Sequence, residues 1–216
     1  LGQVLSDRRV GTVGNGIDRM EIKLGESNEL LIRGDTVFAG YYRNEEATRM
    51  SIRDGWLHTG DVAEFKDGHF RIVDRLKDIM ITAGGKNLSP SEIENMVKSS
   101  AFIKECVVIG DARKYVSALI QIDFDLAGKW AEEKGVAYTN FKNLTENDSL
   151  RELIQSEIDT ANAQLAQVSQ IRKFHLLTKE LDHDDDEVTA TMKVRRFNVQ
   201  KKYASEIEGL YSRHGS

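Results

Sequence analysis

The pattern of apolar residues changes near residue 75, and this change constrains the fold more than any other feature of the sequence. Before it, short apolar runs alternate with glycines, as in MEIKL at 20–24, which Gly25 follows. Such runs with glycine turns are typical of antiparallel strands, so we predict an antiparallel sheet or a small barrel. After residue 75, apolar residues recur at both strand and helix spacing. The chain is therefore predicted to be α+β, with a β-rich first part and a mixed second part.

The first part contains one strong local signal. The dipeptide Asp67-Gly68 stands between the apolar runs 62–65 and 70–73. Because Asp and Gly tolerate the positive φ that a tight hairpin turn needs, these two runs are predicted to pair. Further strands are expected at 20–24, 30–32 and 37–38.

The second part is predicted to be a compact α+β domain with a central, mainly antiparallel sheet. Ser89 or Ser91 can cap a helix whose apolar face is Ile93, Met96 and Val97. The remaining expected elements are strands at 106–109, 116–122 and 171–177 and helices from about Asp125, from about Ser149 and over 197–211.

Composition narrows the functional classes. A length of 216 residues corresponds to one or two domains, and the net charge of −5 argues against a general binder of nucleic acid. No apolar run approaches the ~18 residues of a membrane span. Cys106 is the single cysteine, which fits a reducing cytoplasm better than a disulfide framework. The chain starts at Leu1 inside a glycine-punctuated segment, so we expect it to be a piece of a longer protein.

The segment DGWLHTGD at 54–61 is a candidate binding site. A carboxylate after Thr-Gly, just before a hairpin, can accept hydrogen bonds from the vicinal hydroxyls of a ribose. A turn aspartate that caps its own backbone is the other interpretation of Asp61, and spacing alone favours it.

Two further segments follow at the change of pattern. The charged run at 74–78 is either a solvated linker or a hinge between domains. An apolar strand then leads into Gly84 and Gly85, which allow a backbone to approach a ligand closely, and Lys86 can meet a phosphate. The spacing of a Walker loop is absent.

The last candidate segment is TATMKVRR at 189–196, where Lys193 is by default a surface lysine. It follows an acidic stretch at 182–187 that we interpret as a solvated loop; His183 within it has no partner spacing for a metal site. Cys106 is interpreted as a buried strand residue rather than a nucleophile.

Taken together and in order, these segments resemble the AMP-binding, adenylate-forming enzyme superfamily, and within it the long-chain acyl-CoA synthetases (long-chain fatty acid–CoA ligases). The residues that carry the resemblance are GTVG at 11–14, GYYRNEEAT at 40–48, the block from Asp54 to Glu94, and TATMKVRR. The resemblance implies a two-step ligase reaction with ATP and coenzyme A. A carboxylate first forms an acyl-adenylate, and the thiol of coenzyme A then displaces AMP.

The resemblance also implies roles for individual residues. Asp61 matches the aspartate that binds the ribose hydroxyls, and Arg75 matches the arginine that contacts the ribose or the phosphates. Lys77 matches the hinge about which a small C-terminal domain swings between the two steps (domain alternation). Lys193 matches the catalytic lysine of adenylation.

The resemblance places the contact with coenzyme A at the double glycine. Gly84 and Gly85 match the turn that lines the pantetheine tunnel, and Lys86 aligns approximately with a basic residue that contacts phosphate. No metal ligand is predicted in this chain, since Mg²⁺ would be bound mainly by an upstream region.

The resemblance divides the chain into 1–73 (the C-terminal β subdomain of the large AMP-binding domain), 74–78 (the hinge) and 79–216 (the mobile C-terminal domain). The phosphate loop of the superfamily does not occur in the sequence, so we expect a missing N-terminal adenylating domain and an isolated fragment with little activity. A long-chain fatty acid is the expected substrate, in a cytoplasmic enzyme of lipid metabolism, with peripheral contact at the inner membrane face as an open alternative. Another adenylate-forming enzyme (carrier-loading, or another acid–CoA ligase) and a non-catalytic binding module also remain open.

Overall fold

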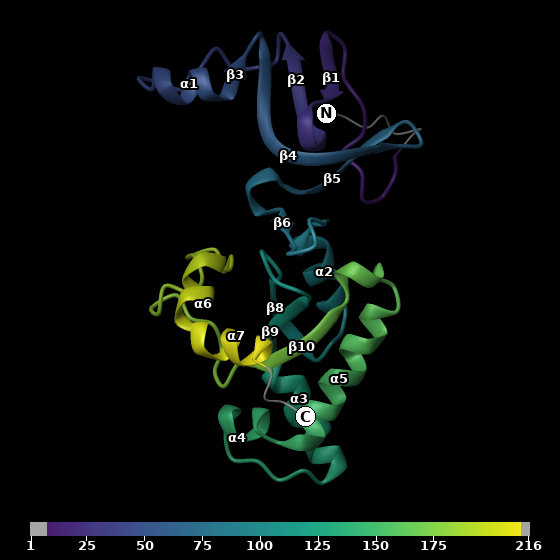
Figure 1. Cartoon of the computed structure of the whole chain (residues 1–216), viewed down its shortest axis with the longest axis vertical. Coiled ribbons are helices and arrows are strands. Elements are labelled where there is room, and N and C mark those ends of the chain that lie inside the picture. Colours follow the sequence, from purple (N-terminus) through teal and green to yellow (C-terminus); the bar gives the residue numbers. More distant parts are fainter. Residues whose placement is uncertain (1–7, 213–216) are drawn as a thin grey trace. The chain divides into compact units, whose positions relative to one another are not determined.

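The computed structural model describes residues 8–212, so the start at Leu1 lies outside the described residues. Contacts divide the chain into two compact units, with the division between Ile79 and Met80 (Figure 1). Each unit contains a sheet and a buried cluster of its own. Strand β5 reaches Arg75, so the expected boundary after residue 73 falls inside a strand. Whether 74–78 acts as a hinge stays a prediction.

The first unit is built on a five-stranded antiparallel sheet in the order β1-β2-β4-β3, with β5 also paired to β4. Its strands are β1 (Met20–Leu24), β2 (Glu29–Gly34), β3 (Ile52–Arg53), β4 (Trp56–Lys66) and β5 (His69–Arg75). The long β4 pairs with β3 at its start, with β2 as far as Val62 and with β5 from Asp61 onward, and Figure 1 shows it as a curved strand. The same unit contains a short helix α1 (Glu45–Ser51) and the one-turn helices η2 (Glu26–Asn28) and η3 (Leu76–Asp78).

The predicted hairpin at Asp67-Gly68 is confirmed. The two residues have φ of 51° and 81°, the pair of positive angles that a type I′ turn requires, and β4 and β5 pair on either side. The strand predicted at Val37–Phe38 is wrong. The chain turns directly after β2, where the N–H of Val37 donates to the carbonyl of Gly34, and Phe38 packs against Tyr41 instead, with ring centroids 5.0 Å apart.

The second unit is built on a three-stranded sheet in the order β10-β9-β8. β8 and β9 are antiparallel, whereas β10 runs parallel to β9, so the sheet contains one parallel pair. Together with the helices around it, this sheet confirms the predicted α+β class. The parallel return is possible because three helices lie between β9 and β10 in the chain. The strands are β8 (Ile103–Ile109), β9 (Val116–Ile122) and β10 (Ile171–Leu176), and a small hairpin pairs β6 (Met80–Ile81) with β7 (Asn87–Leu88).

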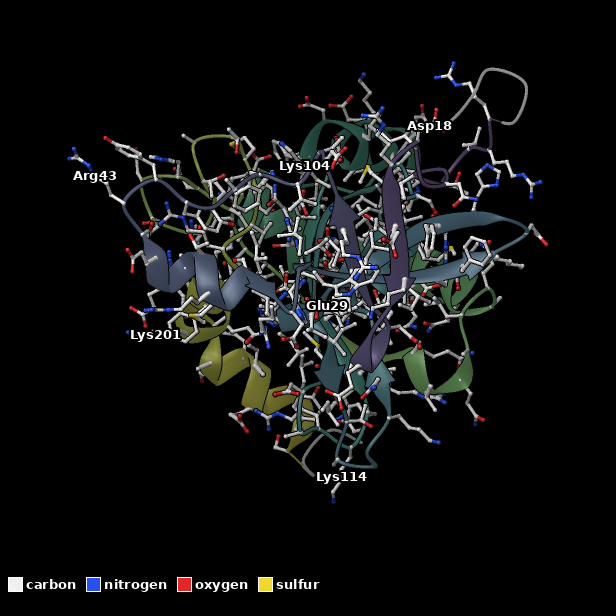
Figure 2. The ribbon with its side chains drawn as sticks, turned by 90° about the horizontal axis from the view of Figure 1, so that it is seen from above. Asp18, Glu29, Arg43, Lys104, Lys114 and Lys201 are labelled. Atoms are coloured by element: carbon white, nitrogen blue, oxygen red, sulfur yellow. The ribbon has the colours of Figure 1, made fainter. Side chains whose placement is uncertain are left out.

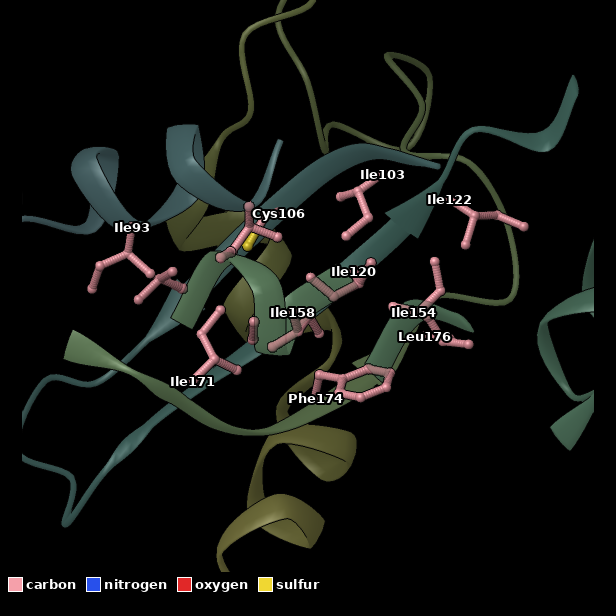
Figure 3. Packing of buried hydrophobic residues seen from close by; sticks show 14 of the residues in the cluster. Ile93, Ile103, Cys106, Ile120, Ile122, Ile154, Ile158, Ile171, Phe174 and Leu176 are labelled. Atoms are coloured by element: carbon pink, nitrogen blue, oxygen red, sulfur yellow. The ribbon is translucent and has the colours of Figure 1, made fainter. Parts of the chain in front are cut away.

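Helices cover both faces of this sheet, which explains its continuous apolar strands. In β8, Cys106 and Val108 face the larger cluster, and Val107 and Ile109 face the opposite one. Figure 3 shows side chains of the larger cluster, including Ile154 from a helix and Ile120 from β9. The helices on the side of the larger cluster are α2 (Pro90–Val97), α3 (Phe124–Lys134), α4 (Phe141–Thr145) and α5 (Asp148–Asn162). Those on the opposite side are α6 (Arg196–Lys202) and α7 (Ala204–Tyr211). The one-turn helix η4 (Gln167–Ser169) precedes β10.

Local capping sets the helix starts. Ser89, one of the two predicted caps, accepts a hydrogen bond from the N–H of Glu92 at the start of α2, and Asp123 caps α3 in the same way. The single helix predicted over 197–211 is wrong, because the chain breaks at Tyr203 into α6 and α7. The Tyr203 ring is buried there and its hydroxyl contacts Glu187, 3.1 Å away. Among the helices within residues 8–212, none is long and apolar enough to cross a membrane.

Candidate functional site

Asp61 and Arg75 lie opposite each other on β4 and β5. The Nη1 atom of Arg75 is 3.0 Å from Oδ1 of Asp61 and donates to the carbonyl of Thr59 at 3.3 Å. Asp61 is half-buried and Arg75 is exposed, so the guanidinium orients the carboxylate while both groups remain accessible to solvent. Asp61 therefore lies within a strand and is not a turn residue that caps its own backbone.

The buried carboxylate of Glu29 holds the part of β4 that leads into Asp61. Glu29, at the start of β2, lies 2.8 Å from Nδ1 of His58 and accepts a hydrogen bond of 3.0 Å from the N–H of Gly60. Figure 2 labels Glu29 among the strands, in contrast to Arg43, which projects outward. The Thr59 hydroxyl donates to the carbonyl of Leu30 and accepts from the N–H of Asp61. The backbone that leads into Asp61 is thus held from two sides.

The sequence pattern does not reveal Glu29 or its contact with His58. The available signal was an acidic residue that opens the apolar run LLI at 30–32, where a carboxylate must find hydrogen-bond donors once the strand is buried. Its partners lie about thirty residues further along the chain, on β4.

Lys77 lies in η3, the one-turn helix of Leu76–Asp78, and its side chain is exposed. The N–H of Ile79, which follows this turn, donates to the carbonyl of Arg75 at 3.2 Å. The segment 74–78 is therefore not one solvated linker: its first two residues complete β5, where Asp74 is buried.

Gly84, Gly85 and Lys86 form the exposed turn of the β6–β7 hairpin. The turn is closed by hydrogen bonds from Thr82 N–H to the Lys86 carbonyl (3.0 Å) and from Gly85 N–H to the Thr82 carbonyl (2.8 Å). Gly85 has φ of +72°, and no atom lies within 4 Å of where a Cβ would stand. Its backbone conformation favours glycine, and the space beside it is open.

Lys193 lies in a short loop closed by a β-bridge between Val188 and Val194, directly before the second bridge residue. Hydrogen bonds order the backbone of Lys193 within the loop: the N–H of Thr189 donates to the Lys193 carbonyl (2.8 Å), and the N–H of Lys193 donates to the Thr189 hydroxyl (3.0 Å). The side chain is exposed, and within residues 8–212 no hydrogen bond or ion pair occupies its ammonium. Lys193 thus combines an ordered backbone with an available positive charge.

The acidic stretch before this loop is not simply solvated. Asp182 to Asp186 are exposed, but Glu187 is completely buried. Its carboxylate lies 2.7 Å from Nζ of Lys179 and 3.0 Å from Nζ of Lys202. These two ammonium groups and the N–H of Asp182 keep the pKa of Glu187 below its usual value in spite of burial.

The same two lysines also hold Asp185 and lower its pKa to about 2. Burial, with the neighbouring Glu187 charge, raises the pKa of Tyr203 to about 12. Burial likewise raises the pKa of Cys106, which agrees with a structural residue rather than a nucleophile.

The structure thus brings the predicted residues together in three groups: Asp61 with Arg75 on adjacent strands, Gly84 and Gly85 with Lys86 in one turn, and Lys193 alone in its loop. Lys77 lies in η3, two residues after Arg75. Within residues 8–212, no three His, Cys, Asp or Glu side chains are grouped so that they could hold a metal ion.

Comparison with known proteins gives these groups a family context. The pattern of the AMP-binding enzyme C-terminal domain matches residues 77–215, more than half of the chain. The chain belongs to this family. The matched region contains Lys77, the double glycine and Lys193, and the resemblance seen in the sequence is confirmed.

Similarity to curated relatives extends the match to the first unit. The chain is 37% identical over 210 residues to the long-chain-fatty-acid–CoA ligase FadD15 of Mycobacterium tuberculosis, covering 96% of this chain and 35% of that protein. It is 31% identical over 228 residues to long chain acyl-CoA synthetase 1 of Arabidopsis thaliana, covering 96% and 34%. The chain therefore spans about a third of the length of these relatives.

A solved AMP-binding structure shares the fold. The A domain of a carboxylic acid reductase from Segniliparus rugosus, in complex with AMP and a co-purified carboxylic acid, superposes with a TM-score of 0.70 at 20% identity. The match covers 94% of this chain and 33% of that one. At this identity the likeness concerns the fold alone.

Proposed function

We propose that this chain is the C-terminal part of an ATP-dependent long-chain fatty acid–CoA ligase. The observation that carries the proposal is the 37% identity to a ligase of that name over 96% of the chain, across both units. The accessible Asp61–Arg75 pair in one unit and the exposed Lys193 side chain in the other agree with it.

In the first step, a carboxylate oxygen of the fatty acid attacks the α-phosphorus of ATP, and the bond to pyrophosphate breaks. Negative charge grows on the α-phosphoryl oxygens during this step. The ammonium of Lys193 reaches these oxygens and stabilises the charge electrostatically. An ammonium that has no partner among residues 8–212 suits this role, since no ion pair within that part of the chain must be broken first.

Asp61 holds the nucleotide during this step. Its carboxylate accepts hydrogen bonds from the two ribose hydroxyls, and Arg75, 3.0 Å away, both orients that carboxylate and contacts the ribose or a phosphate. The Glu29 contacts to His58 and Gly60 restrict the strand that carries Asp61.

In the second step, the thiol of coenzyme A loses its proton and attacks the acyl carbon, and the bond to AMP breaks. The exposed turn of Gly84 and Gly85 lies beside the pantetheine arm, where the absence of a Cβ lets the backbone approach it, and Lys86 contacts a phosphate of the coenzyme. Rotation about Lys77 exchanges the Lys193 loop for this turn between the two steps. ATP and Mg²⁺ would be held mainly by an adenylating domain upstream of this chain.

The test uses the full-length enzyme that contains this chain. Lys193→Ala is expected to reduce acyl-adenylate formation, measured as acid-dependent exchange of pyrophosphate into ATP, by roughly 100-fold or more. Thioester formation from pre-made acyl-adenylate should change little. Lys129→Ala, at another exposed lysine on α3, serves as the matched control. Equal losses in both half-reactions would remove Lys193 from the adenylation step.

The substrate is tested separately, because one fold serves several acids. Acyl-CoA formation should be fastest with long-chain fatty acids and slow with acetate or aromatic acids. A preference for aromatic acids would instead favour another adenylate-forming enzyme, such as another acid–CoA ligase. No ATP-dependent reaction with any acid would favour a non-catalytic module. A cytoplasmic location and peripheral contact with a membrane stay predictions.

A further inference from the structure

The loop that carries Lys193 is anchored at its base by buried charge. Glu187 directly precedes Val188, the first residue of the bridge that closes the loop. Its carbonyl accepts a hydrogen bond of 2.8 Å from the N–H of Arg195, on the other stem of the loop. Glu187 therefore takes part in the closure with its backbone, while its side chain points into the protein interior.

The Glu187 side chain ties the loop base to two other elements. Lys179 follows β10, and Lys202 and Tyr203 lie at the end of α6; all three contact the carboxylate at 2.7–3.1 Å. With the N–H of Asp182 at 2.9 Å, both oxygens have donors. A fully buried carboxylate with partners on several sides has little freedom to shift, because any displacement leaves a charge without a donor.

A second contact set holds the same stem from outside. The side-chain amide of Asn198, on α6, donates to the carbonyl of Asp186 at 2.9 Å and to its carboxylate at 2.8 Å. The Asp186 carboxylate also pairs with Arg195. Asp186 and Glu187, the two residues that lead into the loop, therefore both contact side chains of α6.

We propose that Glu187, with Asn198 as an outer support, is a positioning residue that holds the Lys193 loop in the geometry needed for adenylation. This inference rests on the proposed function, in which the Lys193 ammonium stabilises charge at the α-phosphate. Glu187 acts through the loop base, since its own carboxylate is buried and occupied and cannot contact a substrate.

The predicted consequence is selective. A loop displaced by about 1 Å should lower the rate of the step that uses Lys193 by roughly 10- to 100-fold. The step that uses the Gly84–Gly85 turn should be spared, because β6 and β7 pair with each other and have no hydrogen bond to the loop among the described residues.

The experiment compares variants of the full-length enzyme in the two half-reactions. Glu187→Gln keeps the side-chain size and removes the charge, and Asn198→Ala removes only the outer support, so it should leave folding intact. Both should reduce pyrophosphate exchange, by roughly 10- to 100-fold for Glu187→Gln and by less for Asn198→Ala, with thioester formation from pre-made adenylate within about twofold of wild type. Ile154→Val, in the cluster on the opposite face of the sheet, is the control for a general loss of stability and should show no such split.

The outcomes separate this inference from the function on which it rests. If Lys193→Ala leaves adenylation unchanged, the proposed function fails. If Lys193→Ala lowers adenylation but Asn198→Ala and folded Glu187→Gln stay within twofold of wild type, the positioning role is overturned. A Glu187→Gln variant that slows both half-reactions equally also overturns it, and if that variant does not fold, Asn198→Ala alone decides.

Discussion

The buried Glu187 carboxylate should contribute strongly to the stability of the second unit, and Glu187→Gln measures that contribution. On the Oε1 side, the introduced amide oxygen can still accept from Tyr203 and Lys202. On the Oε2 side, an NH₂ group would face the Lys179 ammonium and the N–H of Asp182, which are both donors. Two charge-assisted hydrogen bonds are therefore lost and replaced by donor–donor contacts.

Hydrogen bonds to a charged group contribute about 1.5–3 kcal/mol each, so two would total about 3–6 kcal/mol. The lower end applies here, because Lys179 is partly exposed and keeps its contact of 2.6 Å with Asp185. We expect Glu187→Gln to lower the free energy of unfolding at pH 7 by about 3 kcal/mol.

Urea unfolding of the 216-residue chain, followed by tryptophan fluorescence, measures this loss of free energy. Trp56 lies in the first unit and Trp130 in α3 of the second, so a Trp56→Phe background leaves a probe of the second unit. Glu180→Gln is the matched control: its partner Lys104 is 3.2 Å away, both side chains are half exposed, and the expected loss is below about 1 kcal/mol. A loss from Glu187→Gln as small as that of the control would refute the reasoning.

The pH dependence supplies an independent check on the same group. The pKa of Glu187 is lower in the folded state than its usual 4.5, so its stabilisation is fully present above pH 4.5 and is lost as the pH falls through the folded pKa. The difference in unfolding free energy between wild type and Glu187→Gln should therefore be constant above about pH 5 and shrink below pH 4.5. A difference that grows towards acid pH would contradict the assigned ion pairs.

Three further substitutions test the architecture. Ile154→Ala, fully buried on α5, should cost about 2–5 kcal/mol in urea unfolding of the second unit; a cost under 1 kcal/mol would mean that the helix does not pack there. Ser89→Ala should cost about 1 kcal/mol by the same measurement through loss of the α2 cap, whereas Ser91→Ala should cost less. Gly68→Val should lower the free energy of unfolding of the first unit by about 1–2 kcal/mol, because valine is strained at the φ of +81°. Urea unfolding followed by Trp56 fluorescence in a Trp130→Phe background measures this loss. An unchanged urea midpoint would exclude the I′ turn.

Local signals in the sequence predicted most elements. The Asp67-Gly68 turn, the cap at Ser89 and the apolar spacing of α5 each depend on residues that are at most a few positions apart, so the chain near them determines the outcome. The strand predicted at 37–38 is wrong because two apolar residues are too few to specify a neighbouring strand. The backbone turns after Gly34 instead.

The candidate residues were named by resemblance, and their surroundings came only from the structure. Sequence spacing favoured a turn aspartate at Asp61, because the strand partner Arg75 cannot be recognised without the register of β4 and β5. The acidic stretch at 182–187 was interpreted as solvated, since five of its six residues are exposed and the pattern does not single out Glu187.

The sequence by itself determined the α+β class, the change of pattern near residue 75, the local turns and caps, and the family. The tertiary structure decided that β10 runs parallel to β9, that Glu29 supports Asp61 and that Glu187 is buried between Lys179 and Lys202. The physical reason is the range of the interactions. Turns and caps are satisfied within a few residues, whereas a buried charge is stable only where the fold brings its partners from other strands and helices.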